Sequence, residues 1–356
     1  MRRWGVLVAV MVAVLVPRGT VAGPLDPAEW LTYRSRFVLP EGRVVDTGNK
    51  GISHSEGQGY GMLLAAAFED RPTFDLLWRW TRQALQVRGD ALFAWKWEPA
   101  AGGQGRVADR NSASDGDLLI AWALLRGERR WSGAGYGDAA RAILADVRRR
   151  LVVDSPAPGV RGPVLLPGPE GFRRDDGSIV VNLSYWLFPA FNEFAAVDPG
   201  GPWADLVRTG VELVRQARFG AWRLPPDWLL LGERTVPARG FGPAVFGYNA
   251  VRVPLNLVWG RAGTPEDLRP FAEFWSRFDG APYIPATVDL TTDALADYGL
   301  FSGGRAISVL VRFGTGGADA GGTAGAMMPR PSPQDDYYAA SLLLLARIAL
   351  LEGMSP

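Results

Sequence analysis

The chain has 356 residues, of which 47% are apolar, and its charges nearly balance, with 38 basic and 37 acidic residues. It has no cysteine and one histidine, His54, which excludes disulfides, cysteine–histidine catalysis and histidine metal triads. No basic stripe is present, so we do not expect nucleic acid as a partner. We also expect no metal and no cofactor, so that any catalysis must use carboxylates.

The N-terminus has the pattern of a secretory signal peptide, residues 1–22. Two arginines precede an apolar run at 6–16, and small residues follow at 20–22. The run of about eleven residues is too short to cross a bilayer, although an uncleaved anchor remains the alternative. We therefore expect cleavage after Ala22, a secreted or periplasmic protein, and a single domain over residues 23–356.

Helical periodicity dominates this domain. Apolar side chains recur every three or four residues, as in Phe74, Leu77, Trp78 and Leu85, and predict about eleven helices. The helices are expected near 27–39, 56–68, 72–87, 115–127, 136–151, 184–195, 203–217, 246–260, 265–277, 303–313 and 334–351. Such a series fits a closed double ring of helix hairpins or a solenoid, and no repeat of about 34 to 45 residues supports the solenoid.

Long loops separate several of these helices and are candidate binding surface, since functional residues concentrate on loops held by a rigid scaffold. They span 88–113, 154–182, 219–243, 279–302 and 314–333. Small β ribbons are expected near 160–166 and 178–181. The fold class is therefore all-α, with long loops and short ribbons at the open face.

Two of the predicted helices have acidic residues in their first turn. The segment 55–61 places Glu56 among Gly57, Gly59 and Gly61, which each cost a helix roughly 1 kcal/mol against alanine and so indicate a close approach to the backbone. The segment 111–117 places Asp115 and Asp117 at the start of the next such helix. Two carboxyl groups brought together form the apparatus for cutting a glycosidic bond. Solvated first-turn acids, with Ser55 as the cap of the first helix, are the structural alternative.

Several segments in order along the chain resemble the signatures of glycoside hydrolase family 8. They are 42–46, 55–62, 92–97, 111–124, 225–228 and 248–254. The likeness is greatest to the secreted endoglucanases that accompany bacterial cellulose synthesis. The resemblance implies an (α/α)6 barrel and inverting hydrolysis of internal β-1,4 links in cellulose or another β-glucan. It implies Glu56 as the proton donor and Asp115 as a sugar-gripping or second catalytic carboxylate.

The chain departs from the family pattern at Asn249, where many members have the aspartate that acts as base. An amide cannot take a proton from water at useful pH. Another carboxylate could be the base, with Asp115 as the first choice and Asp227, Asp289 or Asp293 after it. Alternatively, Asn249 only positions water in a slow enzyme, or the protein is an inactive relative that binds glucan.

The remaining candidates for substrate binding are aromatic and polar residues of the same segments. They are Tyr60, Trp95, Trp97, Asp117, Tyr185, Asp227, Tyr248 and Arg252. Trp95 and Trp97 share one side if their segment is extended, and Arg252 shares a helix face with Tyr248. The pair at 335–336 is interpreted as helix capping.

Chitosan, mixed-linkage glucan and xylan are alternative substrates, and a helical scaffold without sugar affinity is a further alternative. A monomer in loose association with cellulose synthase is expected.

Overall fold

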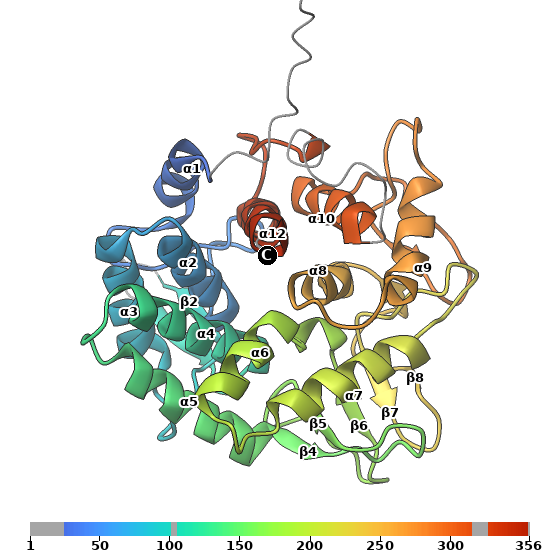
Figure 1. Cartoon of the computed structure of the whole chain (residues 1–356), viewed down its shortest axis with the longest axis horizontal. Coiled ribbons are helices and arrows are strands. Elements are labelled where there is room, and N and C mark those ends of the chain that lie inside the picture. Colours follow the sequence, from blue (N-terminus) through green and yellow to red (C-terminus); the bar gives the residue numbers. More distant parts are fainter. Residues whose placement is uncertain (1–24, 101–104, 315–326, 355–356) are drawn as a thin grey trace, which may run out of the picture.

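Helices arranged in a closed ring make up most of the computed structural model, which describes residues 25–100, 105–314 and 327–354 (Figure 1). The inner helices are α2 (Ser55–Ala67), α4 (Ser114–Arg130), α6 (Phe188–Val197), α8 (Arg252–Trp259), α10 (Ser302–Gly314) and α12 (Tyr337–Met354). Each contacts the next in this order, and α12 returns to contact α2. The return contact closes the ring, which confirms the predicted (α/α)6 barrel and rules out the solenoid.

Outer helices pack against the ring, each beside an inner helix next to it in the chain except α1, which contacts α12. They are α1 (Pro27–Phe37), α3 (Arg71–Leu85), α5 (Tyr136–Leu151), α7 (Trp203–Gln216) and α9 (Pro265–Ser276). The apolar stripe predicted for α3 is buried, since Phe74, Leu77 and Leu85 are fully covered. None of the helices within the described ranges has both the length and the apolar character needed to cross a membrane.

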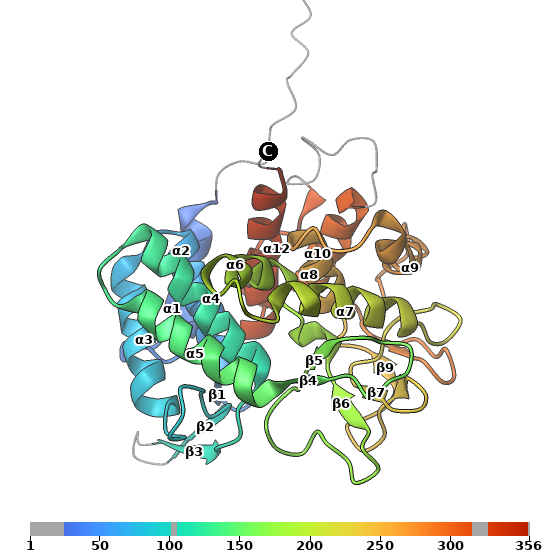
Figure 2. The ribbon, with the colours of Figure 1, turned by 60° about the horizontal axis from the view of Figure 1, so that its bottom comes forward.

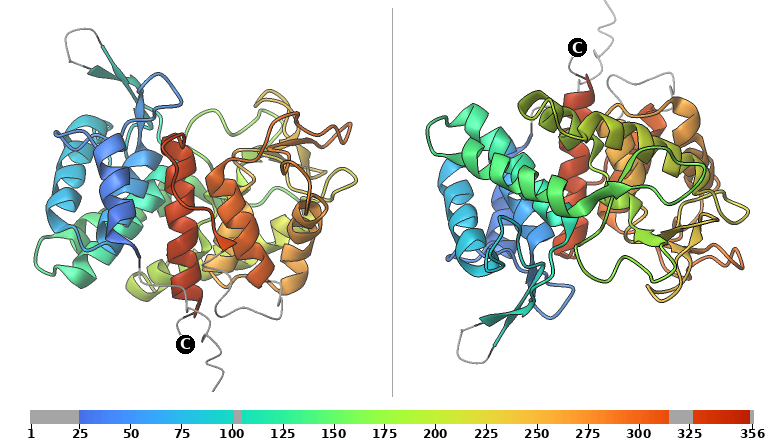
Figure 3. Two further views of the ribbon diagram at one scale, coloured as in Figure 1. Left: turned by 90° about the horizontal axis from the view of Figure 1, so that it is seen from above. Right: turned by 90° about the horizontal axis from the view of Figure 1, so that it is seen from below.

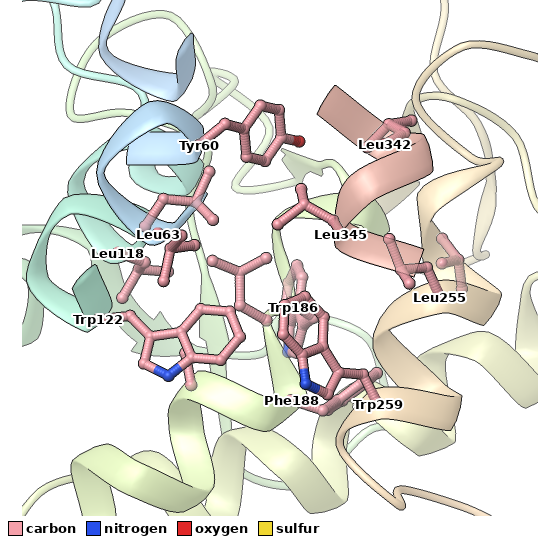
Figure 4. Packing of buried hydrophobic residues seen from close by; sticks show 14 of the residues in the cluster. Tyr60, Leu63, Leu118, Trp122, Trp186, Phe188, Leu255, Trp259, Leu342 and Leu345 are labelled. Carbon is pink, nitrogen blue, oxygen red and sulfur yellow. The ribbon is translucent and has the colours of Figure 1, made fainter. Parts of the chain in front are cut away.

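Large apolar side chains from the inner helices fill the centre of the ring (Figure 4). The ring centroids of Trp122 on α4 and Trp259 on α8 lie 4.8 Å apart. The guanidinium of Arg126 covers Trp122 at 4.4 Å. Trp186 and Phe188 are fully buried beneath them. Such aromatic groups bury the large area that a chain without disulfides needs for stability.

Short antiparallel strands lie at the end of the barrel opposite the C-terminus (Figure 2). They are β1 (Ser53–His54), β2 (Lys96–Pro99), β3 (Gly105–Asp109), β4 (Val152–Asp154), β5 (Pro163–Leu165), β6 (Ile179–Val181), β7 (Leu229–Leu231), β8 (Val236–Pro237), β9 (Val245–Phe246) and β10 (Val288–Asp289). The hairpin of β2 and β3 projects from the body (Figure 3). The ribbons expected near 160–166 and 178–181 correspond to β5 and β6.

Two predicted helices differ from the structure for local reasons. The helix expected at 246–260 begins only at Arg252, because the carboxylate of Asp227 accepts the N–H groups of Gly247, Asn249 and Ala250 and holds them in a turn. Tyr248 therefore lies in a turn and not on the helix face predicted for it. The helix expected at 184–195 is split into a short 3-10 turn, Leu183–Tyr185, and α6, which has a proline in its first turn.

The glycines at the start of α2 allow neighbouring elements to approach, as predicted, but the approaching groups belong to the protein. A Cβ on Gly59 would lie 2.5 Å from the Cβ of Leu119 on α4, and one on Gly57 would lie 2.9 Å from the hydroxyl of Tyr337 on α12. On α4, a Cβ on Gly116 would lie 2.0 Å from the Oγ of Ser55. The two acid-bearing helix starts are therefore in direct contact.

Candidate active site

A cavity of about 490 Å³ opens where α2 and α4 begin. Its lining combines aromatic, charged and amide side chains from segments far apart in the sequence. They include Asp46, Asn49, His54, Glu56, Trp95, Asp115, Tyr185, Tyr248, Asn249, Arg252, Asp336 and Tyr338. Glu56, Asp115 and Asn249 were predicted as one site from separate motifs, and the structure brings them together. Among the described residues no acid or histidine cluster has the arrangement of a metal site.

Glu56 lies in the first turn of α2 with its side chain 16% exposed at the cavity. The cap of this helix is His54, whose Nδ1 accepts the N–H of Gly57, and not Ser55 as predicted. The Oε1 of Glu56 accepts hydrogen bonds from the hydroxyl of Tyr60 at 3.3 Å and from Arg252. The carboxyl is thus held firmly while one edge stays open to a ligand.

Arg252, buried at the start of α8, joins the polar residues of the cavity. Its Nη1 contacts Glu56, the hydroxyl of Tyr60 at 3.1 Å and Oδ2 of Asp115 at 3.4 Å. Its Nη2 donates to Oδ1 of Asn249 at 2.8 Å. One guanidinium therefore fixes the acid, its neighbouring carboxyl and the amide in a single network, using the planar fork of donors that lysine lacks.

Asp115 is buried and sits beside Glu56. Burial and the negative charge of Glu56 together raise the pKa of Asp115 to about 7, although Arg252 and the N–H of Gly116 oppose the rise. Both carboxyls contact Nη1 of Arg252. An inverting hydrolase needs roughly 6.5–9.5 Å between acid and base to admit a water. Asp115 therefore lies on the acid's side of the cavity, which argues against it as the base.

The other acids considered as the base lie outside the cavity lining. Asp227 stabilises the turn before α8, where its carboxylate accepts three backbone N–H groups. Asp289 accepts the N–H groups of Thr291 and Thr292. Asp293 accepts that of Ala221. Their roles are structural, because each stabilises a loop.

Two residues predicted to bind substrate are instead buried. Asp117 is fully covered, and its Oδ1 accepts the N–H of Phe93 at 2.9 Å. Tyr60 is 3% exposed and reaches Glu56 and Arg252 but not the cavity. Neither side chain can touch a sugar, so both support the site from behind.

Trp97, named with Trp95 as a candidate for substrate binding, lies outside the cavity lining. Trp95 lines the cavity, but it precedes β2, and the register of β2 shifts between Lys96 and Trp97. This irregularity interrupts the alternation of an extended strand. Trp97 packs edge-on against Trp80, with ring centroids 5.7 Å apart, and beneath the guanidinium of Arg43.

The aromatic part of the lining comes from Trp95, Tyr185, Tyr248 and Tyr338. Tyr248 is 47% exposed and stacks on Phe301 with ring centroids 5.5 Å apart. Aromatic faces beside polar donors suit the alternating C–H and hydroxyl surface of a sugar. Tyr338, on α12, was not among the predicted site residues, because no local signal separates it from the core positions of that helix.

Several polar residues of the cavity were not predicted, including Asp46, Asn49, His54 and Asp336. Asp46 and His54 precede α2 and are joined by a 3.2 Å contact between Oδ2 and Nε2. Asp336 caps α12 through the N–H of Ala339, as interpreted from the sequence, and it also lines the cavity. The position of His54, two residues before Glu56, was the available signal.

The family model described as "Glycosyl hydrolases family 8" matches residues 1–350 of this sequence. The chain belongs to this family. It is 40% identical over 347 residues to a probable endoglucanase of Novacetimonas hansenii, covering 95% of this chain and 96% of that protein. It is 36% identical to an endoglucanase of Cellulomonas uda, covering 82% and 80%.

Solved structures agree with this assignment. The endo-β-1,4-glucanase CMCax of Acetobacter xylinum superposes with a TM-score of 0.82 at 40% identity, covering 92% of this chain and 98% of that one. A cold-adapted family 8 xylanase shares the fold, with a TM-score of 0.71 at 19% identity. The barrel is thus common to both.

Proposed function

We propose that this glycoside hydrolase is an endo-β-1,4-glucanase that cleaves internal bonds of cellulose or soluble β-glucan. The observation that carries the proposal is Glu56, a constrained carboxyl at the edge of an open cavity lined by aromatic side chains. The names of the relatives at 36–40% identity support the same activity. No step requires a metal or cofactor.

In this mechanism, Glu56 is the general acid that protonates the leaving oxygen. A general acid must keep its proton until the bond breaks. The raised pKa of Asp115, caused by burial and by the charge of Glu56, means that a second negative charge beside Glu56 is unfavourable. Arg252 and Tyr60 fix the direction of the Glu56 carboxyl.

The mechanism also requires activation of the attacking water, for which the cavity offers no obvious general base. Asn249 can hold a water by hydrogen bonds but cannot accept its proton. Of the other lining carboxylates, Asp115 is beside the acid, Asp46 is bonded to His54, and Asp336 caps α12. We therefore propose that Asn249 positions the attacking water in an enzyme slower than relatives with aspartate there.

The test is hydrolysis of carboxymethyl cellulose by the mature protein, followed through new reducing ends. Glu56→Gln keeps the shape of the side chain and removes its proton, so activity should fall by about 10²–10⁴-fold. Glu266→Gln, on the outer helix α9, is the matched control and should keep wild-type activity. Wild-type turnover by Glu56→Gln, with an unchanged melting temperature, would remove the assignment of the acid.

A second candidate function is glucan binding without catalysis, and Asn249 is the observation that favours it. Calorimetry with cellohexaose separates the possibilities. Binding together with slow release of reducing ends supports the glucanase. Binding without hydrolysis supports the accessory role, and no binding leaves only a helical scaffold. Chitosan, mixed-linkage glucan and xylan belong in the same assay as alternative substrates.

We also propose that the protein is exported and acts as a monomer in loose association with a cellulose synthase. The segment 1–22, which lies outside the described residues, has the composition of a signal peptide. N-terminal sequencing of the exported protein should start at Gly23. A protein that keeps its first residues in the membrane fraction would instead be an anchored form.

A further inference from the structure

A ribbon of backbone, residues 283–300, folds back on itself beside the turn that precedes α8. Within it, the N–H of Ala286 donates to the carbonyl of Tyr298 at 3.1 Å. The strand β10 belongs to this ribbon and pairs with β9, which ends two residues before Tyr248. The ribbon is therefore tied by backbone hydrogen bonds to the segment that carries Tyr248 to the cavity.

Two tyrosine side chains of the ribbon are exposed, Tyr298 by 49% and Tyr283 by 44%. A Cβ on Gly299 would lie 3.2 Å from the Cβ of Tyr283, so Tyr283 lies on the face toward which Gly299 points. Successive residues of extended backbone point to opposite faces, so Tyr298 lies on the other face. The phenol of Tyr298 neighbours that of Tyr248, whose pKa is raised by burial and by this neighbour. Tyr298 therefore continues the aromatic lining of the cavity outward, and Tyr283 does not.

A single exposed aromatic side chain is common on protein surfaces and needs no function. Here two exposed rings are neighbours, and the inner one, Tyr248, lines the cavity while Tyr298 lies outside its lining. Stacking on Phe301 holds the ring of Tyr248 in place. The surrounding segment 279–302 contains four aspartates and no lysine or arginine. Such a surface disfavours phosphates and other polyanions and suits an uncharged chain.

We propose that Tyr298 and Tyr248 form a distal subsite for one glucosyl ring of a β-1,4-glucan whose neighbouring rings occupy the cavity. The C–H face of the sugar packs on the phenol rings, and its hydroxyl groups stay in water. Tyr298 is then a specificity-determining residue for chain length, because only an oligomer that reaches beyond the cavity gains this contact. The subsite rests on the proposed function for the identity of its ligand.

The experiment is calorimetry with cellohexaose and cellotriose, carried out in the Glu56→Gln background so that neither oligomer is cleaved. Both oligomers are uncharged, unlike carboxymethyl cellulose, so the acidic segment does not repel them. Adding Tyr298→Ala should raise the Kd for cellohexaose about 2- to 10-fold, the size of one aromatic contact. The Kd for cellotriose should stay unchanged, because this oligomer fills only the cavity.

Tyr283→Ala is the matched control, since it removes the same side chain from the same ribbon at similar exposure but on the opposite face. It should leave both Kd values unchanged, and Tyr298→Phe, which keeps the ring, should retain the affinity for cellohexaose. An unchanged Kd for cellohexaose in Tyr298→Ala would overturn the subsite. An equal loss for both oligomers, or the same loss in Tyr283→Ala, would show a structural role for the ribbon and overturn it as well.

The proposed function fails separately from the subsite. Oligomer binding without hydrolysis by the wild-type chain would refute the glucanase, while the calorimetry of Tyr298→Ala would still decide the subsite. No binding of cellohexaose to the chain with Tyr298 intact would refute both.

Discussion

Asn249 lines the cavity at the position that the family resemblance gives to the base, and its surroundings already suit a carboxylate. Its Oδ1 accepts from Nη2 of Arg252 at 2.8 Å, and its backbone N–H is fixed by Asp227. An aspartate there would keep both contacts. The guanidinium would also favour its ionised form, which is the form a general base requires.

Asn249→Asp should therefore raise kcat at least about tenfold, because general base catalysis contributes about 10²–10⁴-fold. The measurement is the initial rate of reducing-end release from carboxymethyl cellulose. Asn249→Ala is the control, since it removes the amide without supplying a base, and its rate should be lower than wild type. An unchanged or lower rate in Asn249→Asp would indicate that a base exists elsewhere in the cavity.

At the level of single residues, the sequence predicted those whose motif is contiguous. Glu56 and Asp115 stand in distinctive short segments, and both line the cavity. Asp117 was misplaced because two residues of one helix turn face different directions, and the sequence does not say which faces the cavity. Tyr338 was missed because only the closing of the ring brings α12 to the site.

The contact between α2 and α4 sets the geometry of the site at the level of elements. Gly116 faces the start of α2 so closely that an added Cβ would lie 2.6 Å from the Cβ of Ser55 and 2.8 Å from the backbone nitrogen of Glu56. The backbone cannot yield as a flexible side chain could. Any side chain at 116 must push the two helix starts, and with them the two carboxyls, apart.

Gly116→Ala should accordingly lower the free energy of unfolding by about 1–3 kcal/mol, the usual cost of overpacking. It should also reduce kcat more than its stability loss explains, because Glu56 and Asp115 shift. Urea unfolding and the reducing-end assay measure the two effects. Gly200→Ala, where an added Cβ meets nothing within 4 Å, is the control. Full activity in folded Gly116→Ala would contradict the close-contact account.

The helix positions were predicted from apolar periodicity. The errors in helix boundaries arose where a side chain from elsewhere in the chain redirects the backbone. Helix α5 was predicted at the residues where it occurs, 136–151. The start of α8 was predicted six residues early because the capping carboxylate, Asp227, comes from about twenty residues before the turn. Such a contact is invisible to local pattern, and it places Tyr248 and Asn249 on a turn at the cavity.

For the molecule as a whole, the closed ring explains why the site contains so many protonated or paired acids. Helix starts that converge on one end bring Glu56, Asp115 and Asp117 into a poorly solvated region. The fold class could be predicted from helix number and length. The charge balance of the interior could not, because it depends on which acids the closed ring deprives of water.

The effect of burying an acid on the stability of the fold can be measured at Asp117. Burial raises its pKa to about 8, well above the ordinary value of 3.8, despite the hydrogen bond from the N–H of Phe93. The folded protein therefore holds a proton that the unfolded chain releases above about pH 4. Stability is complete below that pH and is lost as pH rises toward about 8. One proton corresponds to about 1.4 kcal/mol per pH unit.

Asp117→Asn should remove this dependence, because asparagine keeps the oxygen that accepts from Phe93 and has no proton to lose. Between pH 5 and about 7, the free energy of unfolding in urea should decline less steeply in the variant, by about 1.4 kcal/mol per pH unit. Asp138→Asn, whose side chain is 85% exposed on α5, should leave the slope unchanged. Because Asp117 does not reach the cavity, the variant should retain its activity profile. Parallel slopes in wild type and Asp117→Asn would mean that this acid is ionised in the folded protein.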